Sequence, residues 1–131
     1  MRTFGLSFLS ALLVLAVLDG IWLGFIGRDF YKARLGPLMR EDPVWLAAVL
    51  FYLLHAAGIA TFAVPAALGA GTWLAAACYG ALYGLFVYAA YDLTNQAVLR
   101  GWSTTLTVVD MGWGALVTAT ATLVAFLMVH R

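Results

Sequence analysis

Charged residues are scarce in this chain. Its 131 residues include seven Lys and Arg and six Asp and Glu, whereas 65% of the side chains are hydrophobic. A soluble domain is usually about 25% charged, and a chain this short has too much surface to hide so many apolar side chains in its own core. The mean hydropathy of +0.98 therefore excludes a soluble domain and a disordered tail. The excess apolar surface must face lipid.

Several chemical signatures are also missing. The single cysteine, Cys78, excludes an internal disulfide and a disulfide scaffold. The net charge of +1 provides no basic face for nucleic acid. We find no nucleophile beside a base, no phosphate-binding loop and no nucleotide fingerprint. The sequence consequently specifies no enzyme class and no cofactor.

Four long apolar stretches are present, each near the length of about 20 residues that crosses a hydrocarbon core. Because short connections place consecutive helices antiparallel, the expected fold class is all-α: an integral membrane four-helix antiparallel bundle with up-down-up-down order. Asp42 and Pro43 predict the start of the second helix, and Ser103 predicts the start of the fourth. We expect one transmembrane domain, residues 1–131, with spans at about 4–26, 44–68, 72–99 and 104–129.

Basic residues predict the orientation of these spans. Five of the seven lie in the connection 27–43 or just after the third span: Arg28, Lys32, Arg34, Arg40 and Arg100. The positive-inside rule then places the basic loops in the cytoplasm and both termini outside, with Arg2 and Arg131. Phe30 and Tyr31 lie among the charges of the loop, which fits either a segment along the lipid headgroups or an ordinary topogenic loop.

Each span contains an ionisable residue at membrane depth: Asp19, His55, Asp92 and Asp110. Inserting an aspartate at the centre of a membrane helix costs roughly 2.5–3.5 kcal/mol, so such a residue is a functional-site hypothesis by default. At 1.5 Å per residue, the aspartates lie about 9–13 Å from the cytoplasmic ends of their helices, and His55 about 16 Å. The three carboxyls are thus expected to share one layer.

Helical periodicity adds neighbours to these acids. Gly84, Tyr88, Asp92 and Asn95 form one stripe of the third span. The first and fourth spans share the pattern Asp-x-x-Trp, a hint of an inverted repeat. No Glu-x-x-His or His-x-x-x-His spacing occurs, so no metal site is predicted. The predicted ligand or proton site comprises Asp19, Trp22, His55, Tyr88, Asp92, Asn95, Asp110 and Trp113, with Arg28 and Arg100 as gates or counter-charges at its cytoplasmic mouth.

The same polar residues also have a purely structural interpretation. Polar side chains hold membrane helices together. Asp92 would in addition be a helix cap if the third helix ended near Tyr91. The clustering of four such residues favours a ligand or proton site over these alternatives.

Three runs of the sequence are the most distinctive: Leu18–Gly24, Tyr91–Trp102 and Val109–Gly114. Together with Asp29-Phe30-Tyr31 in the first loop, they resemble a bacterial membrane-protein family catalogued as domain of unknown function 2177. The resemblance covers essentially the whole chain. It implies a four-helix, multi-pass protein of the bacterial inner membrane and supplies no activity.

Three functions compete at this stage. The first is a cytoplasm-facing intramembrane polar pocket that binds or modifies a small lipid-soluble or amphipathic molecule, with the lipid bilayer and that molecule as the partners. The second is a proton-coupled carrier or channel subunit, which would need a homo-oligomer because four spans are few for a transport path. The copies would contact each other through the helix face of Gly20 and Gly24 or through that of Gly80 and Gly84. The third is a structural or assembly subunit of a larger membrane complex, in which buried aspartates fix helix register.

Overall fold

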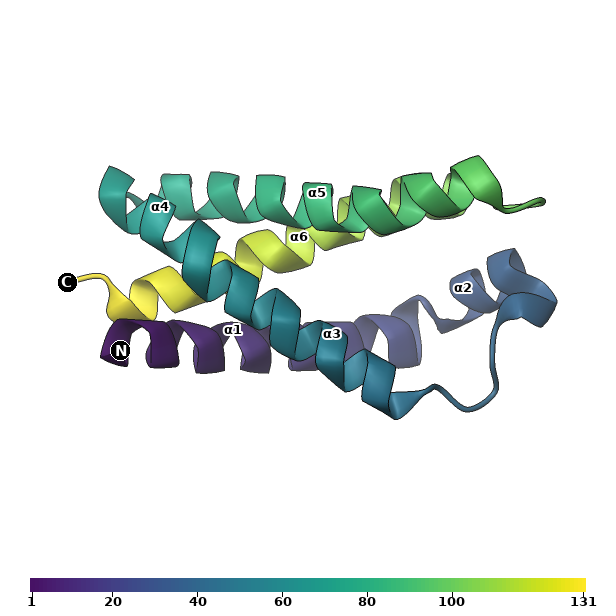
Figure 1. Ribbon diagram of the computed structural model, residues 1–131, viewed down its shortest axis with the longest axis horizontal. Coiled ribbons are helices and arrows are strands. Elements are labelled where there is room, and N and C mark those ends of the chain that lie inside the picture. The colour runs from purple at the N-terminus through teal and green to yellow at the C-terminus, as the bar shows by residue number, and fades with distance from the viewer.

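The computed structural model describes residues 1–131 and contains helices without strands (Figure 1). Two of the helices end in π-helical segments, Trp22–Ile26 after α1 and Ile59–Ala63 between α3 and α4, and a short 3₁₀ turn, Gly36–Leu38, follows α2. The α-helices are α1, Arg2–Ile21; α2, Arg28–Leu35; α3, Trp45–Gly58; α4, Val64–Ala70; α5, Trp73–Val98; and α6, Thr104–Val129.

Four continuous helical stretches are long and apolar enough to cross a membrane: Arg2–Ile26, Trp45–Ala70, Trp73–Val98 and Thr104–Val129. At 1.5 Å per residue each is about 38 Å long, which exceeds the hydrocarbon core of about 30 Å. Large apolar side chains such as Leu13, Phe62 and Leu116 are exposed on the outside of the helices. The predicted all-α membrane fold with four spanning helices is therefore confirmed.

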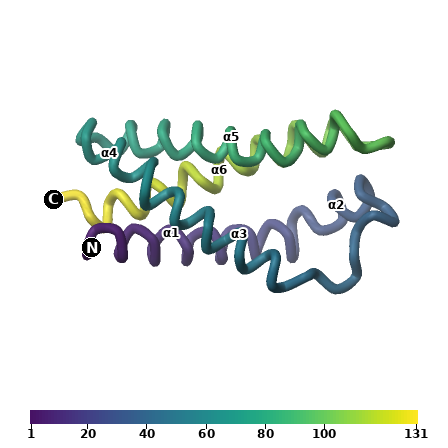
Figure 2. The backbone as a smooth tube through the Cα atoms, in the orientation of Figure 1, coloured from purple at the N-terminus to yellow at the C-terminus, as the bar shows by residue number.

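The helices run lengthwise between two ends of the molecule. Both termini lie at one end and α2 lies at the other, so α1 leads toward α2 and α6 leads back (Figures 1 and 2). Helix α6 packs on both α5 and α1, and the α5–α6 contact is the most extensive of the fold. Helix α3 contacts α1, whereas α4 contacts α5. The second span thus crosses obliquely from one neighbour to the other.

Small residues let α5 and α6 approach closely. A Cβ atom added at Gly80 would lie 2.6 Å from the hydroxyl of Thr122, and one added at Gly84 would overlap Thr118 and the backbone of Gly114. Close backbone approach at small residues is a usual source of van der Waals packing between membrane helices. The Gly80 and Gly84 face is therefore filled by α6 of the same chain, so it is not free for the oligomer interface that we considered.

Side-chain caps mark the starts of α5 and α6. The hydroxyls of Thr72 and Ser103 accept hydrogen bonds of 3.1 Å from the backbone N–H groups three residues later. The predicted cap at Asp42 with Pro43 in the first turn is wrong, because α3 begins only at Trp45 and has no side-chain cap. Val44 is extended, since this connection must cover the distance between α2 and the start of α3 (Figure 1).

Candidate functional site

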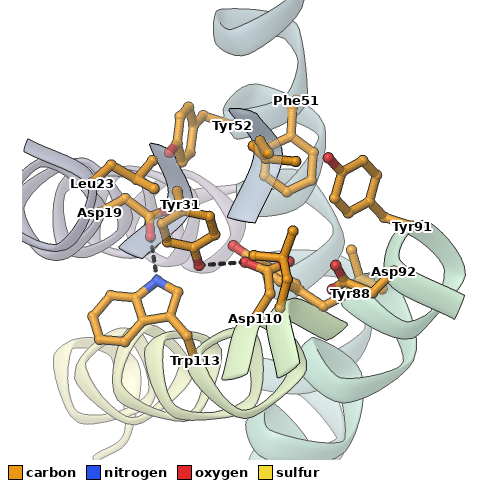
Figure 3. Close-up of a pocket in the computed structure, with 13 residues that line it drawn as sticks. Asp19, Leu23, Tyr31, Phe51, Tyr52, Tyr88, Tyr91, Asp92, Asp110 and Trp113 are labelled. Carbon is orange, nitrogen blue, oxygen red and sulfur yellow. Dashed lines mark hydrogen bonds between the residues drawn. The ribbon is translucent and has the colours of Figure 1, made fainter. Parts of the chain in front are cut away.

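A cavity of about 380 Å³ lies at the end of the bundle nearest α2 (Figure 3). We call it the central cavity, and every helix except α4 contributes to its wall. Three aspartates, six aromatic residues and four aliphatic residues line it: Asp19, Leu23, Tyr31, Leu35, Phe51, Tyr52, Val87, Tyr88, Tyr91, Asp92, Leu106, Asp110 and Trp113. The predicted carboxyl layer is thus brought together around one space.

Asp19 connects the first and last helices. It lies near the end of α1 and is 3% exposed. Its Oδ1 atom accepts a 2.6 Å hydrogen bond from the indole Nε1 of Trp113 on α6, and its Oδ2 atom has no partner. This hydrogen bond ties α1 to α6 at the cavity wall.

Tyr31 enters the cavity from α2. It is buried, donates a 2.6 Å hydrogen bond to Asp110 and accepts a 3.0 Å hydrogen bond from the indole of Trp22. Burial raises the pKa of the Tyr31 phenol, and the hydrogen bond to Asp110 raises that pKa further. The phenol therefore stays protonated and donates to the carboxyl. Helix α2 is thus held against the bundle by this side chain.

Hydrogen bonds join each of the two Asp-x-x-Trp patterns to the other. Trp113 of the second pattern donates directly to Asp19 of the first, while Trp22 of the first reaches Asp110 of the second through the Tyr31 hydroxyl. The two indoles stack with centroids 4.6 Å apart and planes 11° apart. The repeated pattern thus has a physical basis in the contact between α1 and α6.

Asp92 differs from the other two acids. It is 0% exposed on α5 and lines the central cavity, no N–H or hydroxyl group donates to either of its carboxyl oxygens, and its neighbour is the carboxyl of Asp110. Burial of a carboxyl without such a donor is costly. The cap interpretation is wrong, because α5 continues for six residues beyond Asp92, to Val98.

His55 is not part of the cavity wall, although its ring contacts Phe51 and Tyr88, which are. Its Nε2 atom is 3.0 Å from the hydroxyl of Thr118, and its ring stacks between Phe51, at a centroid distance of 5.4 Å, and Tyr83, at 5.5 Å. It is 3% exposed and lines no part of the central cavity. The structure places this residue in the α3–α6 contact, so it is not brought together with the carboxyls as the predicted site required.

Four further predicted residues also lie outside the cavity wall: Trp22, Arg28, Asn95 and Arg100. Asn95 is one turn beyond Asp92 on α5, and Arg28 and Arg100 are exposed at the same end of the molecule. Trp22 contributes through Tyr31 and through its stacking on Trp113. No group of three His, Cys, Asp or Glu side chains is arranged to hold a metal ion.

Sequence reasoning missed most of the aromatic wall. Tyr31, Phe51, Tyr52 and Tyr91 line the cavity, yet none was among the predicted site residues. Tyr52 shares a helix face with His55, and Tyr31 belongs to the Asp-Phe-Tyr run of the family resemblance, so both carried a signal. Tyr91 opens another run of that resemblance and carried the same kind of signal. Phe51 carried none, because an aromatic residue in a membrane helix normally faces lipid or a neighbouring helix.

Comparison with known proteins identifies a family. The family described as predicted membrane protein (DUF2177) matches residues 4–127. No curated protein and no solved structure matches the chain. With nearly its whole length matched and four apolar helices present, the chain belongs to this DUF2177 family of predicted membrane proteins.

Proposed function

We propose that this multi-pass membrane protein binds a small amphipathic molecule in the central cavity. The observation that carries the proposal is Asp92, a fully buried carboxyl that lies beside Asp110, receives no hydrogen bond from an N–H or hydroxyl group, and lines a largely apolar space of about 380 Å³. Ligand sites commonly combine apolar walls with a few convergent polar groups. A buried acid in a membrane helix is itself a functional-site hypothesis. With Asp110 on the same wall, it is also positioned to exchange a proton with a bound group.

A second cavity supports the amphipathic character of the ligand. This lateral cavity, of about 690 Å³, lies between α1 and α3 and shares Asp19, Leu23 and Tyr52 with the central cavity. Most of its remaining wall is apolar, and Gly20 and Gly24 leave part of it without side chains. A polar head in the central cavity could therefore extend an apolar tail toward the lipid.

The orientation of the protein is part of the proposal. The connections that carry Arg28, Lys32, Arg34, Arg40 and Arg100 all lie at the α2 end. Under the positive-inside rule that end faces the cytoplasm, and both termini face the outside of a bacterial inner membrane. The central cavity would then lie in the cytoplasmic half of the bilayer.

The experiment compares small molecules that co-purify with the protein. Wild type and two variants are extracted from their own membranes into polymer nanodiscs without detergent, and bound molecules are identified by mass spectrometry. Val87→Trp fills the central cavity, whereas Leu82→Trp places the same indole on an outer position of α5 that is 48% exposed. We expect wild type and Leu82→Trp to retain a common molecule that Val87→Trp loses. Equal retention by a folded Val87→Trp protein would contradict the proposal.

The carrier alternative makes a separate demand. It needs an oligomer, and of the two glycine faces considered only Gly20 with Gly24 is unfilled, because a Cβ atom at either position meets nothing within 4 Å. Cross-linking in native membranes distinguishes the two functions. Monomers throughout would exclude the oligomeric carrier and leave the binding function standing.

A further inference from the structure

We propose that the molecule bound in the central cavity is a lipophilic cation, either a membrane-soluble amine or a quaternary ammonium compound. This inference rests on the proposed binding function and adds the chemical class of the ligand. It follows from the charge of the cavity wall, from the aromatic rings in that wall and from the hydrogen bonds that its carboxyls leave unmade.

The cavity wall is acidic and contains no basic side chain. Asp19, Asp92 and Asp110 are its ionisable acids, and no Lys, Arg or His is among the thirteen lining residues. The two predicted counter-charges, Arg28 and Arg100, are exposed and outside the wall. An anionic head such as a phosphate or a fatty-acid carboxylate would meet like charges without a counter-ion, and at low dielectric constant that repulsion is strong.

Aromatic rings form almost half of the wall. Six of the thirteen lining residues are Phe, Tyr or Trp. Phe51, Tyr88 and Tyr91 lie around the same part of the cavity as Asp92 and Asp110 (Figure 3). The face of an aromatic ring attracts a cation electrostatically, and cages of several rings are a common way to recognise quaternary ammonium groups. Carboxyls and rings in one wall therefore favour the same kind of ligand.

The wall carboxyl that receives no hydrogen bond is the proposed counter-ion of the bound cation. Asp110 already accepts from Tyr31, and Asp19 already accepts from Trp113. Asp92 is fully buried beside the Asp110 carboxyl, and no N–H or hydroxyl group donates to it. A cationic head would pair with this carboxyl by its charge, and an amine would in addition donate a hydrogen bond to it, which removes the cost of burying it alone.

The test uses benzyltrimethylammonium and its uncharged carbon isostere, neopentylbenzene, which has the same shape without the charge. Both are titrated into the full chain in nanodiscs of phosphatidylcholine, and binding is measured by calorimetry. We expect the cation to bind at least tenfold more tightly than the isostere and Asp92→Asn to weaken the cation at least tenfold. Asp42→Asn, which neutralises an exposed loop carboxyl, should leave binding unchanged.

A second variant guards against misfolding of the first. Tyr88→Leu keeps all three carboxyls and removes one ring from the wall, so it should weaken the cation more than the isostere. Equal affinity for the two probes, or unchanged cation affinity in both variants, would overturn the cationic assignment. If Val87→Trp still abolished binding of the isostere, the cavity would remain a binding site for a neutral molecule. If neither probe bound, the cationic assignment would be wrong, and the co-purification experiment would decide the binding function by itself.

Discussion

The indole nitrogen of Trp113 donates a 2.6 Å hydrogen bond to the carboxyl of Asp19, and the two residues are 94 positions apart in the chain. This contact joins the last membrane helix to the first at the wall of the central cavity. Trp22 completes the arrangement from the other side, because it stacks on Trp113 and donates to Tyr31. The acids and indoles of the two helices therefore form one connected group.

Trp113→Phe should destabilise the protein more than Trp22→Phe. Both variants keep an aromatic ring in the stack, but the first leaves the buried Asp19 without its donor. Loss of a partner to a buried acceptor costs about 1–3 kcal/mol, whereas in Trp22→Phe the Tyr31 hydroxyl still donates to Asp110. Unfolding in mixed micelles measures the two losses. Equal losses would contradict the importance of the indole donor.

Tyr31→Phe should loosen α2 from the bundle. The variant removes the hydrogen bond from Tyr31 on α2 to Asp110 on α6. The expected loss of stability is about 1–3 kcal/mol. Hydrogen exchange should increase in residues 28–35. Tyr79→Phe is the control, because Tyr79 is exposed on α5 and makes no side-chain hydrogen bond. Unchanged exchange in α2 would show that packing alone holds this helix.

His55 and Thr118 should be energetically coupled without affecting ligand binding. Their side chains lie 3.0 Å apart in the contact between α3 and α6, and hydrogen bonds between membrane helices contribute about 0.6–1.7 kcal/mol. A double-mutant cycle of His55→Phe and Thr118→Val measures that coupling. The binding of benzyltrimethylammonium should remain at its wild-type affinity in Thr118→Val. A large loss of affinity in Thr118→Val would indicate that His55 belongs to the functional site.

Two glycine substitutions should have opposite effects. Gly84→Ala places a methyl group against Thr118 and the Gly114 backbone, and overpacking of this kind costs about 1–3 kcal/mol. Gly20→Ala meets nothing within 4 Å, so it should be neutral or should stabilise α1 by up to about 1 kcal/mol through helix propensity. Thermal unfolding in the same detergent compares them. A destabilising Gly20→Ala would indicate that this face has a partner in the membrane.

Accessibility of single cysteines tests the proposed orientation. In a Cys78→Ser background, which removes the exposed native thiol, Gly69→Cys probes the end of the molecule with the termini and Glu41→Cys probes the α2 end. An impermeant maleimide should label Gly69→Cys in intact spheroplasts and Glu41→Cys only after lysis. The reverse pattern would place the basic connections outside and contradict the positive-inside assignment.

The spanning helices and the acidic layer could be predicted from the sequence. Apolar length is a local property of composition, so it identifies a membrane helix without knowledge of its neighbours. The rise per residue then places Asp19, Asp92 and Asp110 at similar depths, and all three line the central cavity. The cap at Ser103 is equally local, since its hydroxyl accepts a hydrogen bond from the backbone N–H three residues away.

The remaining features depend on tertiary contacts that periodicity does not specify. His55 was predicted to lie deeper than the acids. At that depth it contacts Thr118, which is two turns beyond Asp110 on α6, and both residues are buried. Tyr31 lies in a short polar helix whose composition is typical of a surface segment. Its burial follows from the acceptor that Asp110 provides on another helix, and a single sequence does not reveal such a pairing.

The reciprocal contacts between α1 and α6 also constrain how the protein is made. Of the four membrane helices of this chain, the one with Asp19 leaves the ribosome before the other three, and its donor Trp113 belongs to the fourth. A nascent chain that stops before residue 113 has Asp19 without this hydrogen bond, and a chain that stops before α6 has no central cavity. Synthesis of α6 is therefore the step that completes the central cavity, and a product truncated before Trp113 carries Asp19 without this donor.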